Sequence, residues 1–165
     1  MQRKKITLAV SMALCLSHMH SANSQFEPTI ELADLNGLNG IRFNGVAELD
    51  NSGVSVSSAG DINGDGIDDV IIGANDADPN GTDRAGSTYV VFGTTTTLPN
   101  PFNLSNINGS NGFTINGVAD VDLSGFSVDG AGDINGDGFD DLIIGALYAD
   151  VNGVTDAGSA YVVFG

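Results

Sequence analysis

Two nine-residue segments of the chain carry side-chain oxygens at a regular spacing. The first, residues 61–69, has Asp or Asn at its positions 1, 3, 5 and 9, and glycine at position 6. Alternate residues of a tightly wound loop can point inward together, and glycine allows the sharp turn where a Cβ atom would clash. Calcium in proteins takes about six to eight oxygen ligands. This spacing therefore predicts a calcium loop.

The same pattern recurs at residues 133–141, so the sequence predicts two Ca²⁺ sites. Magnesium fits less well, because it prefers fewer protein ligands and a tight octahedral geometry. The predicted ligands are the side chains at positions 1, 3, 5 and 9 and the main-chain carbonyl of position 7: Asp61, Asn63, Asp65, Ile67 and Asp69 in the first loop, and Asp133, Asn135, Asp137, Phe139 and Asp141 in the second. Position 8, which is Asp68 or Asp140, is predicted to point away from the ion, as a solvated or turn-bonding residue.

The ends of these segments distinguish them from an EF-hand. An EF-hand loop begins in the same way but closes with a bidentate Glu at position 12. Here position 12 is Ile72 or Ile144, inside an apolar run, so each loop is predicted to join two strands. The alternative is an ordinary Asn-Gly and Asp-Gly turn with solvated acids. Three carboxylates at the same spacing twice favour the cation, because without it their repulsion would oppose folding.

Composition limits the chemistry available elsewhere. The chain has 165 residues, with 5 Lys and Arg against 21 Asp and Glu. Residues 1–24 are predicted to be a secretory signal peptide, with a basic start, an apolar run and small residues before a cleavage after Ser24. The apolar run is too short for a transmembrane segment, which takes roughly 20 residues. Residues 25–165 keep all 21 acids but only Arg42 and Arg84 as basic residues, a net charge of −19.

Residues 25–165 contain no His, Cys or Lys. This excludes the usual nucleophiles and general bases, zinc and copper sites that rely on His or Cys, and disulfides. Nucleic acid is excluded as a partner because its phosphates repel such an acidic surface. The sequence therefore predicts a secreted or cell-surface protein that is not an enzyme.

An internal repeat organises the chain. Residues 43–93 align with residues 115–165 without a gap, at an offset of 72, and 35 of the 51 positions are identical. Each copy reads as short strands separated by turns. The predicted strands are 54–57, 70–72, 89–92 and 113–115, with the counterparts 126–129, 142–144, 161–164 and 41–43. The runs 70–72 and 142–144 are continuous and apolar, which predicts strands covered on both faces.

Four short strands per copy is the content of a propeller blade, so the predicted fold class is all-β, with two β-propeller blades. The predicted divisions are a signal peptide (1–24), an N-terminal segment (25–40), a lone outer strand with the first blade (41–117), and a second, incomplete blade (118–165). In a closed ring the lone strand would complete the last blade. Propellers have about four to eight blades. We therefore expect the chain to be a fragment of a longer protein or to need further blades in cis or in trans.

Sequence motifs in both copies resemble the FG-GAP repeat, the blade unit of the integrin α-subunit propeller, which also occurs in bacterial secreted proteins. The resemblance rests on 53–56, 60–61, the acidic loop, 71–74 and 86–92, and on their counterparts in the second copy. Two positions depart from the family pattern. Ser52 and Ser124 replace its Phe, and Asn75 and Leu147 replace its Pro.

The resemblance implies calcium on the face opposite the ligand-binding loops. It also implies a module for cell adhesion or for binding an extracellular protein or glycan. The candidate variable surface is 75–85 and 147–157, where the copies differ most. Two alternatives remain: the non-catalytic propeller portion of a larger secreted hydrolase, or a purely structural surface repeat.

Overall fold

The computed structural model describes residues 29–165, which form strands and turns with three short 3-10 helices. The predicted signal peptide lies outside the described residues. The strands are β1 (Phe43–Asn44), β2 (Ser55–Gly60), β3 (Asp69–Ala74), β4 (Ser87–Val91), β5 (Phe102–Asn103), β6 (Gly112–Asn116), β7 (Ser124–Gly132), β8 (Asp141–Ala146) and β9 (Ser159–Val163). The 3-10 helices are η1 (Leu32–Asp34), η2 (Pro79–Gly81) and η3 (Leu104–Asn106). The high content of Gly and Asn, which are poor helix formers, explains the lack of longer helices in this part of the chain.

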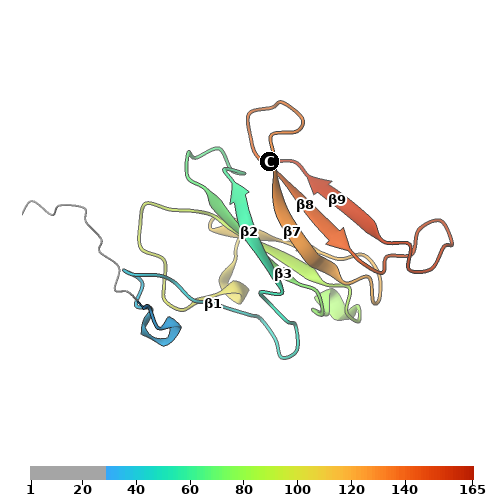
Figure 1. Ribbon diagram of the computed structural model, residues 1–165, viewed down its shortest axis with the longest axis horizontal. Helices are drawn as coiled ribbons and strands as arrows, with labels where there is room; N and C mark the ends of the chain where they lie inside the picture. Colours follow the sequence, from blue (N-terminus) through green and yellow to red (C-terminus); the bar gives the residue numbers. More distant parts are fainter. Residues whose placement is uncertain (1–28) are drawn as a thin grey trace, which may run out of the picture. The chain divides into compact units, whose positions relative to one another are not determined.

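Most strands belong to two antiparallel sheets that lie side by side (Figure 1). The first blade is the four-stranded sheet β2-β3-β4-β6, and the second blade is the three-stranded sheet β7-β8-β9. The predicted strand at 113–115 therefore serves as the outer strand of the first blade, where Ile115 pairs with Thr88. The described residues form two neighbouring propeller blades and no closed ring, as the sequence predicts.

A third, two-stranded sheet lies outside the blades. The predicted strand at 41–43 is observed as β1, which is shifted to Phe43–Asn44 and pairs in parallel with β5. The rings of Phe43 and Phe102 meet edge to face, with centroids 5.8 Å apart. In this structure β1 is thus paired with β5, and it is not the outer strand of a blade.

The core is divided into two clusters, one on each face of the first blade. Between the blades, Ile71 and Val90 of the first pack against Leu142 and Ile144 of the second, and all four are at most 1% exposed. On the other face of the first blade, a second cluster joins strands β3 and β4 to the segment 98–107. Burial of apolar side chains on both faces holds β3 in place, because each buried side chain contributes about 1.5–3 kcal/mol.

The strand β8 differs from the prediction that residues 142–144 are covered on both faces. Leu142 is fully buried, but Ile143 is 40% exposed. Its counterpart in the first blade, Ile71, is fully buried because the second blade covers it. Among the described residues, no third sheet packs on the second blade in the same way. The prediction was therefore right for β3 and wrong for one face of β8.

Candidate metal centre

The two acidic loops occupy equivalent places in the two blades. Residues 61–68 connect β2 to β3, and residues 133–140 connect β7 to β8. Both loops lie at the same end of the blades, at the top of the view in Figure 1. The repeat therefore places both predicted metal sites at one edge of the molecule, at the opposite end of the hairpins from the β3–β4 and β8–β9 connections.

The first loop is wound around its own carboxylates. Oδ1 and Oδ2 of Asp61 accept hydrogen bonds from the backbone N–H groups of Asp65 (2.9 Å) and Gly66 (2.8 Å). The side-chain oxygen of Asn63 accepts a hydrogen bond from the N–H of Asp65 (2.9 Å), and Oδ1 of Asp65 accepts one from Ile67 (2.9 Å). Positions 1, 3 and 5 therefore all direct an oxygen toward the interior of the turn.

The second loop repeats this arrangement. Oδ2 of Asp133 accepts a hydrogen bond from Gly138 (3.0 Å), and its Oδ1 accepts one from Asp137 (3.1 Å). The side-chain oxygen of Asn135 accepts from Asp137 (2.9 Å), and Oδ1 of Asp137 accepts from Phe139 (3.0 Å). The two loops thus share one hydrogen-bonding pattern, as expected from their identical spacing.

Glycine makes this winding of the chain accessible. The residues at position 6, Gly66 and Gly138, have φ angles of 85° and 97°, in the left-handed region. A side chain at these angles would be strained, since only glycine adopts them at little cost. The turn predicted from position 6 is therefore confirmed in both loops.

Position 9 anchors each loop to the blade. Asp69 is 1% exposed, and its two oxygens accept hydrogen bonds from the N–H of Ile62 (3.1 Å) and of Gly93 (2.7 Å). In the second loop Asp141 is fully buried and accepts from Ile134 (2.8 Å) and Gly165 (3.1 Å). These residues therefore tie the loop to the end of the third strand of the blade. The sequence alone did not indicate this role.

The Asp69 carboxyl also responds to the charge of its loop. Burial raises its pKa above the ordinary value of 3.8, and the backbone hydrogen bonds from Gly93 and Ile62 oppose this change. The nearby carboxylates of Asp65 and Asp61 raise the pKa further. A buried acid next to two other acids favours protonation unless a cation neutralises the group. The electrostatics of the loop therefore suit a bound positive ion.

The donor set fits a hard cation, although its side chains are not gathered into a finished site. Within residues 29–165, no group of three or more acidic, histidine or cysteine side chains lies close enough together to hold a metal ion. Each carboxylate has about four lone-pair sites, so an oxygen that accepts an amide hydrogen bond can still bind a cation. The carbonyls of Ile67 and Phe139 accept no hydrogen bond in the described part of the chain and so remain free. An ion would draw these oxygens together.

The two loops also contact each other. Oδ2 of Asp140 accepts a hydrogen bond from the N–H of Asp61 (2.9 Å), and the N–H of Asp140 donates to the Asp61 carbonyl (3.3 Å). The ring of Phe139 covers Gly64 so closely that a Cβ atom at this glycine would overlap the ring. Asp140 was predicted to be solvated or turn-bonding. It instead bridges the two repeats, a contact that sequence spacing does not reveal.

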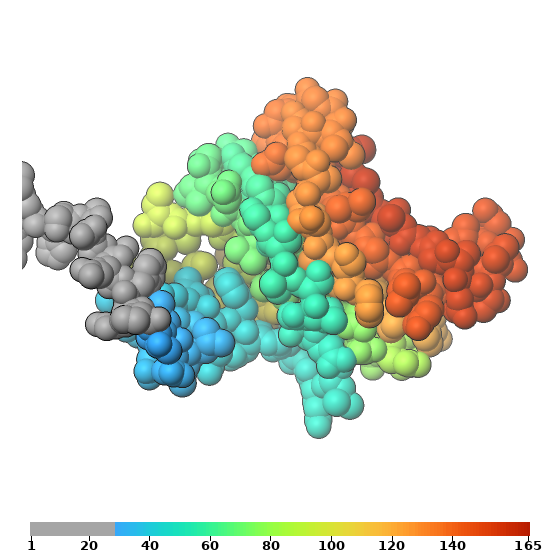
Figure 2. Space-filling model, viewed as in Figure 1, coloured from blue at the N-terminus to red at the C-terminus, as the bar shows by residue number. Residues whose placement is uncertain are grey.

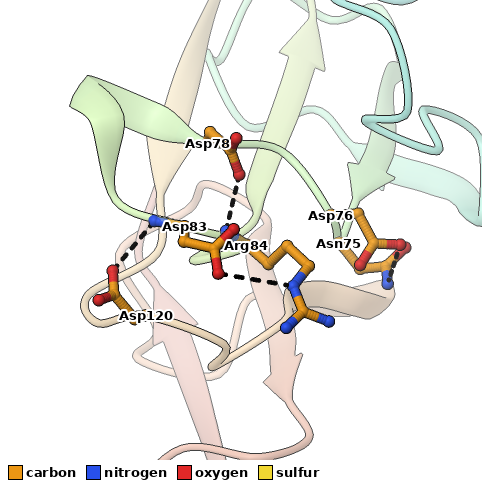
Figure 3. A network of polar contacts seen from close by, with 6 residues as sticks. All are labelled: Asn75, Asp76, Asp78, Asp83, Arg84 and Asp120. Carbon is orange, nitrogen blue, oxygen red and sulfur yellow. Dashed lines mark hydrogen bonds and ion pairs between the residues drawn. The ribbon is translucent and has the colours of Figure 1, made fainter.

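The divergent connections at the other end of the blades have their own polar contacts (Figure 3). The side chain of Arg84 forms an ion pair with Asp83, with 3.8 Å between Nε and Oδ2. The backbone N–H of Arg84 donates a hydrogen bond to Oδ1 of Asp78 (2.7 Å). In the second repeat the N–H of Asp156 donates to Asp150 in the same way (2.8 Å). The loops thus close alike although their sequences differ.

Comparison with known families identifies the repeats. The FG-GAP repeat model matches residues 52–91 and 124–163, which contain the two acidic loops and the first three strands of each blade. No curated protein matches the chain. Among the described residues, no helix is long and apolar enough to cross a membrane.

Proposed function

Because this chain carries two FG-GAP repeats, we propose that it is an exported, calcium-stabilised propeller module that binds a protein or glycan outside the cell. FG-GAP repeats of this kind belong to propeller-type binding modules of extracellular and surface proteins. The observation that carries the calcium proposal is the shared winding of the two acidic loops around Asp61 and Asp133.

Calcium would be held by the oxygens predicted from the sequence. In the first loop these are the side chains of Asp61, Asn63, Asp65 and Asp69 and the carbonyl of Ile67; the second loop supplies Asp133, Asn135, Asp137, Asp141 and the carbonyl of Phe139. Bound Ca²⁺ would neutralise the carboxylates of each loop. The proposed role of the ion is structural, because the loops fix the ends of the β2–β3 and β7–β8 hairpins.

The proposed ligand surface is at the opposite end of the blades from the calcium loops. The connections 75–85 and 147–157 lie there, and six of their eleven aligned positions differ between the repeats. A non-catalytic portion of a larger secreted hydrolase or a purely structural repeat would share the calcium loops. Exchange of 75–85 for 147–157 would separate binding from structure: a binding module loses its extracellular partner, whereas a structural repeat keeps its behaviour.

The calcium proposal is tested by titration calorimetry on the full chain. The wild type is expected to bind about two ions, Asp65→Ala about one, and the double variant Asp65→Ala with Asp137→Ala none. Affinity is expected in the range of extracellular modules, roughly 10⁻⁴ to 10⁻³ M. Asp68→Ala is the matched control, because position 8 is not a predicted ligand. Absence of binding heat in the wild type would refute the proposal.

A further inference from the structure

The second blade has a hollow beside β8 and β9. Its volume is about 400 Å³, and it is lined by the stretches 145–147 and 157–160 together with Phe126 and Ser127. Most of these lining residues are small, and several are partly or fully exposed. The hollow is open to solvent in this structure, so its occupant has to be identified from elsewhere in the molecule.

The equivalent place on the first blade is filled. There the segment 117–125, which leads from β6 into β7, lies directly on two glycines. A Cβ atom on Gly73 would lie 2.0 Å from the carbonyl oxygen of Gly125, and one on Gly86 would lie 2.0 Å from that of Ser124. The counterparts of these glycines in the hollow are Gly145 and Gly158, at the offset of 72 residues.

Backbone hydrogen bonds hold the segment 117–125 on the first blade. Three N–H groups of the segment 117–125 donate to carbonyls of the β3–β4 connection: Val121 to Asp83 (2.7 Å), Leu123 to Arg84 (3.2 Å) and Ser124 to Ala85 (3.0 Å). Beside them, the N–H of Asp83 donates to the carboxylate of Asp120 (3.0 Å; Figure 3). The contact depends mainly on backbone shape and on small residues.

The chain contains a second segment of this shape, residues 45–53. Leu49 and Asn51 have φ angles of 69° and 55°, which match 67° and 53° at their counterparts Val121 and Leu123. Asp50 closes the segment by accepting the N–H of Ala47 (2.9 Å), just as Asp122 does for Ala119 (3.1 Å). The segment 45–53 protrudes at the lower edge of the space-filling view (Figure 2), and Leu49 is 79% exposed.

We infer that the segment 45–53 of one copy of this chain occupies the hollow on the second blade of another copy. The protruding segment has free hydrogen-bond donors, and the hollow has free acceptors. The N–H groups of Leu49, Asn51 and Ser52 donate no hydrogen bond within the described residues. The carbonyl of Ala157, which lines the hollow, and those of the two preceding residues, Thr155 and Asp156, accept none there.

Apolar surface is complementary as well. Val56 on the first blade is 62% exposed, whereas its counterpart Val128 is 5% exposed because it packs on the first blade. On the second blade, Ile143 and Val162 are 40% and 42% exposed, whereas their counterparts in the first blade are fully buried. If the first blade of one copy packed on the second blade of another, as the two blades pack within one chain, the exposed apolar side chains of both blades would be covered. Such head-to-tail contacts produce a ring or an open filament.

Single methyl groups test this inference on the full chain. Gly145→Ala is expected to block the hollow, since the equivalent Cβ on Gly73 would overlap a carbonyl oxygen. In the free chain that Cβ meets Ser127 no closer than 3.6 Å, so the fold tolerates it.

The partner variant places a methyl group on the protruding segment. Gly45→Ala is expected to block the segment, because a Cβ on its counterpart Gly117 would lie 1.9 Å from the Ala85 carbonyl oxygen. Within its own chain that Cβ meets the side chain of Ser52, with Oγ at 2.8 Å and Cβ at 3.0 Å. A rotation of the hydroxyl group and a shift of a few tenths of an ångström in the protruding segment are expected to accommodate it.

Sedimentation equilibrium measures the oligomeric state at protein concentrations up to about 1 mM. At this concentration an interaction with a dissociation constant of about 1 mM is roughly half populated. The wild type is expected to form oligomers, and so is the control Thr97→Ala, which changes an exposed residue between the two repeats. Each glycine variant alone is expected to remain a single chain with a melting temperature close to that of the wild type. An equimolar mixture of the two is expected to form a two-chain species, because it retains one intact interface.

A wild type that remains a single chain throughout this range would overturn the inference, and so would self-association of either glycine variant. Failure of the mixture to pair would also overturn it. None of these results depends on calcium, because neither Gly45 nor Gly145 lies in an acidic loop. The inference therefore fails or stands separately from the proposed function.

Discussion

The N–H of Asp61 donates a hydrogen bond to Oδ2 of Asp140 at 2.9 Å, which joins the first residue of one acidic loop to the eighth residue of the other. The two residues are 79 positions apart in the chain. This contact links the two proposed calcium loops across the interface between the blades. A substitution in one loop is therefore expected to affect the other.

Asp140→Ala is predicted to destabilise the chain, whereas Asp68→Ala is not. The substitution removes an acceptor from the Asp61 N–H, and a hydrogen bond to a charged group contributes about 1–2 kcal/mol at such a partly exposed site. Asp68 occupies the same position of the first loop, and its carboxylate accepts no hydrogen bond within residues 29–165. Urea unfolding of the two variants in chelator checks the difference; equal losses of free energy would contradict it.

Calcium is predicted to raise the thermal stability of the wild type. At a free Ca²⁺ concentration about 100 times the dissociation constant, each site adds about 2.7 kcal/mol to the free energy of unfolding. Asp65→Ala and Asp137→Ala should each remove one contribution, and the double variant should melt at the same temperature in calcium and in chelator. Calorimetric melting curves measure this effect. If the wild type melted at the same temperature in calcium and in chelator, the result would argue against both calcium sites.

The Asp69 carboxyl is predicted to titrate above 3.8 in chelator, because burial and the charges of Asp65 and Asp61 raise its pKa in the folded state. The folded chain then binds this proton more tightly than the unfolded chain does. The contribution of Asp69 to stability therefore grows as the pH falls through its folded pKa, and it levels off below the unfolded pKa. Carbon-detected NMR titration of this carboxyl measures the pKa. Added calcium should lower it, and a value below 3.8 in chelator would contradict the prediction.

Ile71→Ala and Ile143→Ala are predicted to differ, although both residues are followed by Ile-Gly-Ala. Ile71 is fully buried between the blades, so its truncation should cost about 2–5 kcal/mol. Ile143 is 40% exposed, and its truncation should cost less than about 2 kcal/mol. Denaturant unfolding of dilute protein measures both values. Equal costs would mean that the blades do not pack on each other as described.

The local chemistry could be read from the sequence because it depends on residues close together in the chain. The spacing of Asp61, Asn63, Asp65 and Gly66 predicts a wound loop, and the structure confirms its turns. The alternation of short apolar runs and turn residues predicts the strands of both blades. The internal repeat predicts that whatever forms once forms twice.

The tertiary structure decided which copy of a repeated residue is buried and which is exposed. Ile71 and Ile143 share their local sequence, yet one is enclosed and the other faces solvent. Likewise, Asp140 accepts a hydrogen bond from the neighbouring loop, whereas its counterpart Asp68 does not. Exposure and long-range hydrogen bonds depend on what lies across the space beside a residue. The flanking sequence specifies the strand or the turn, but the neighbouring blade supplies that contact.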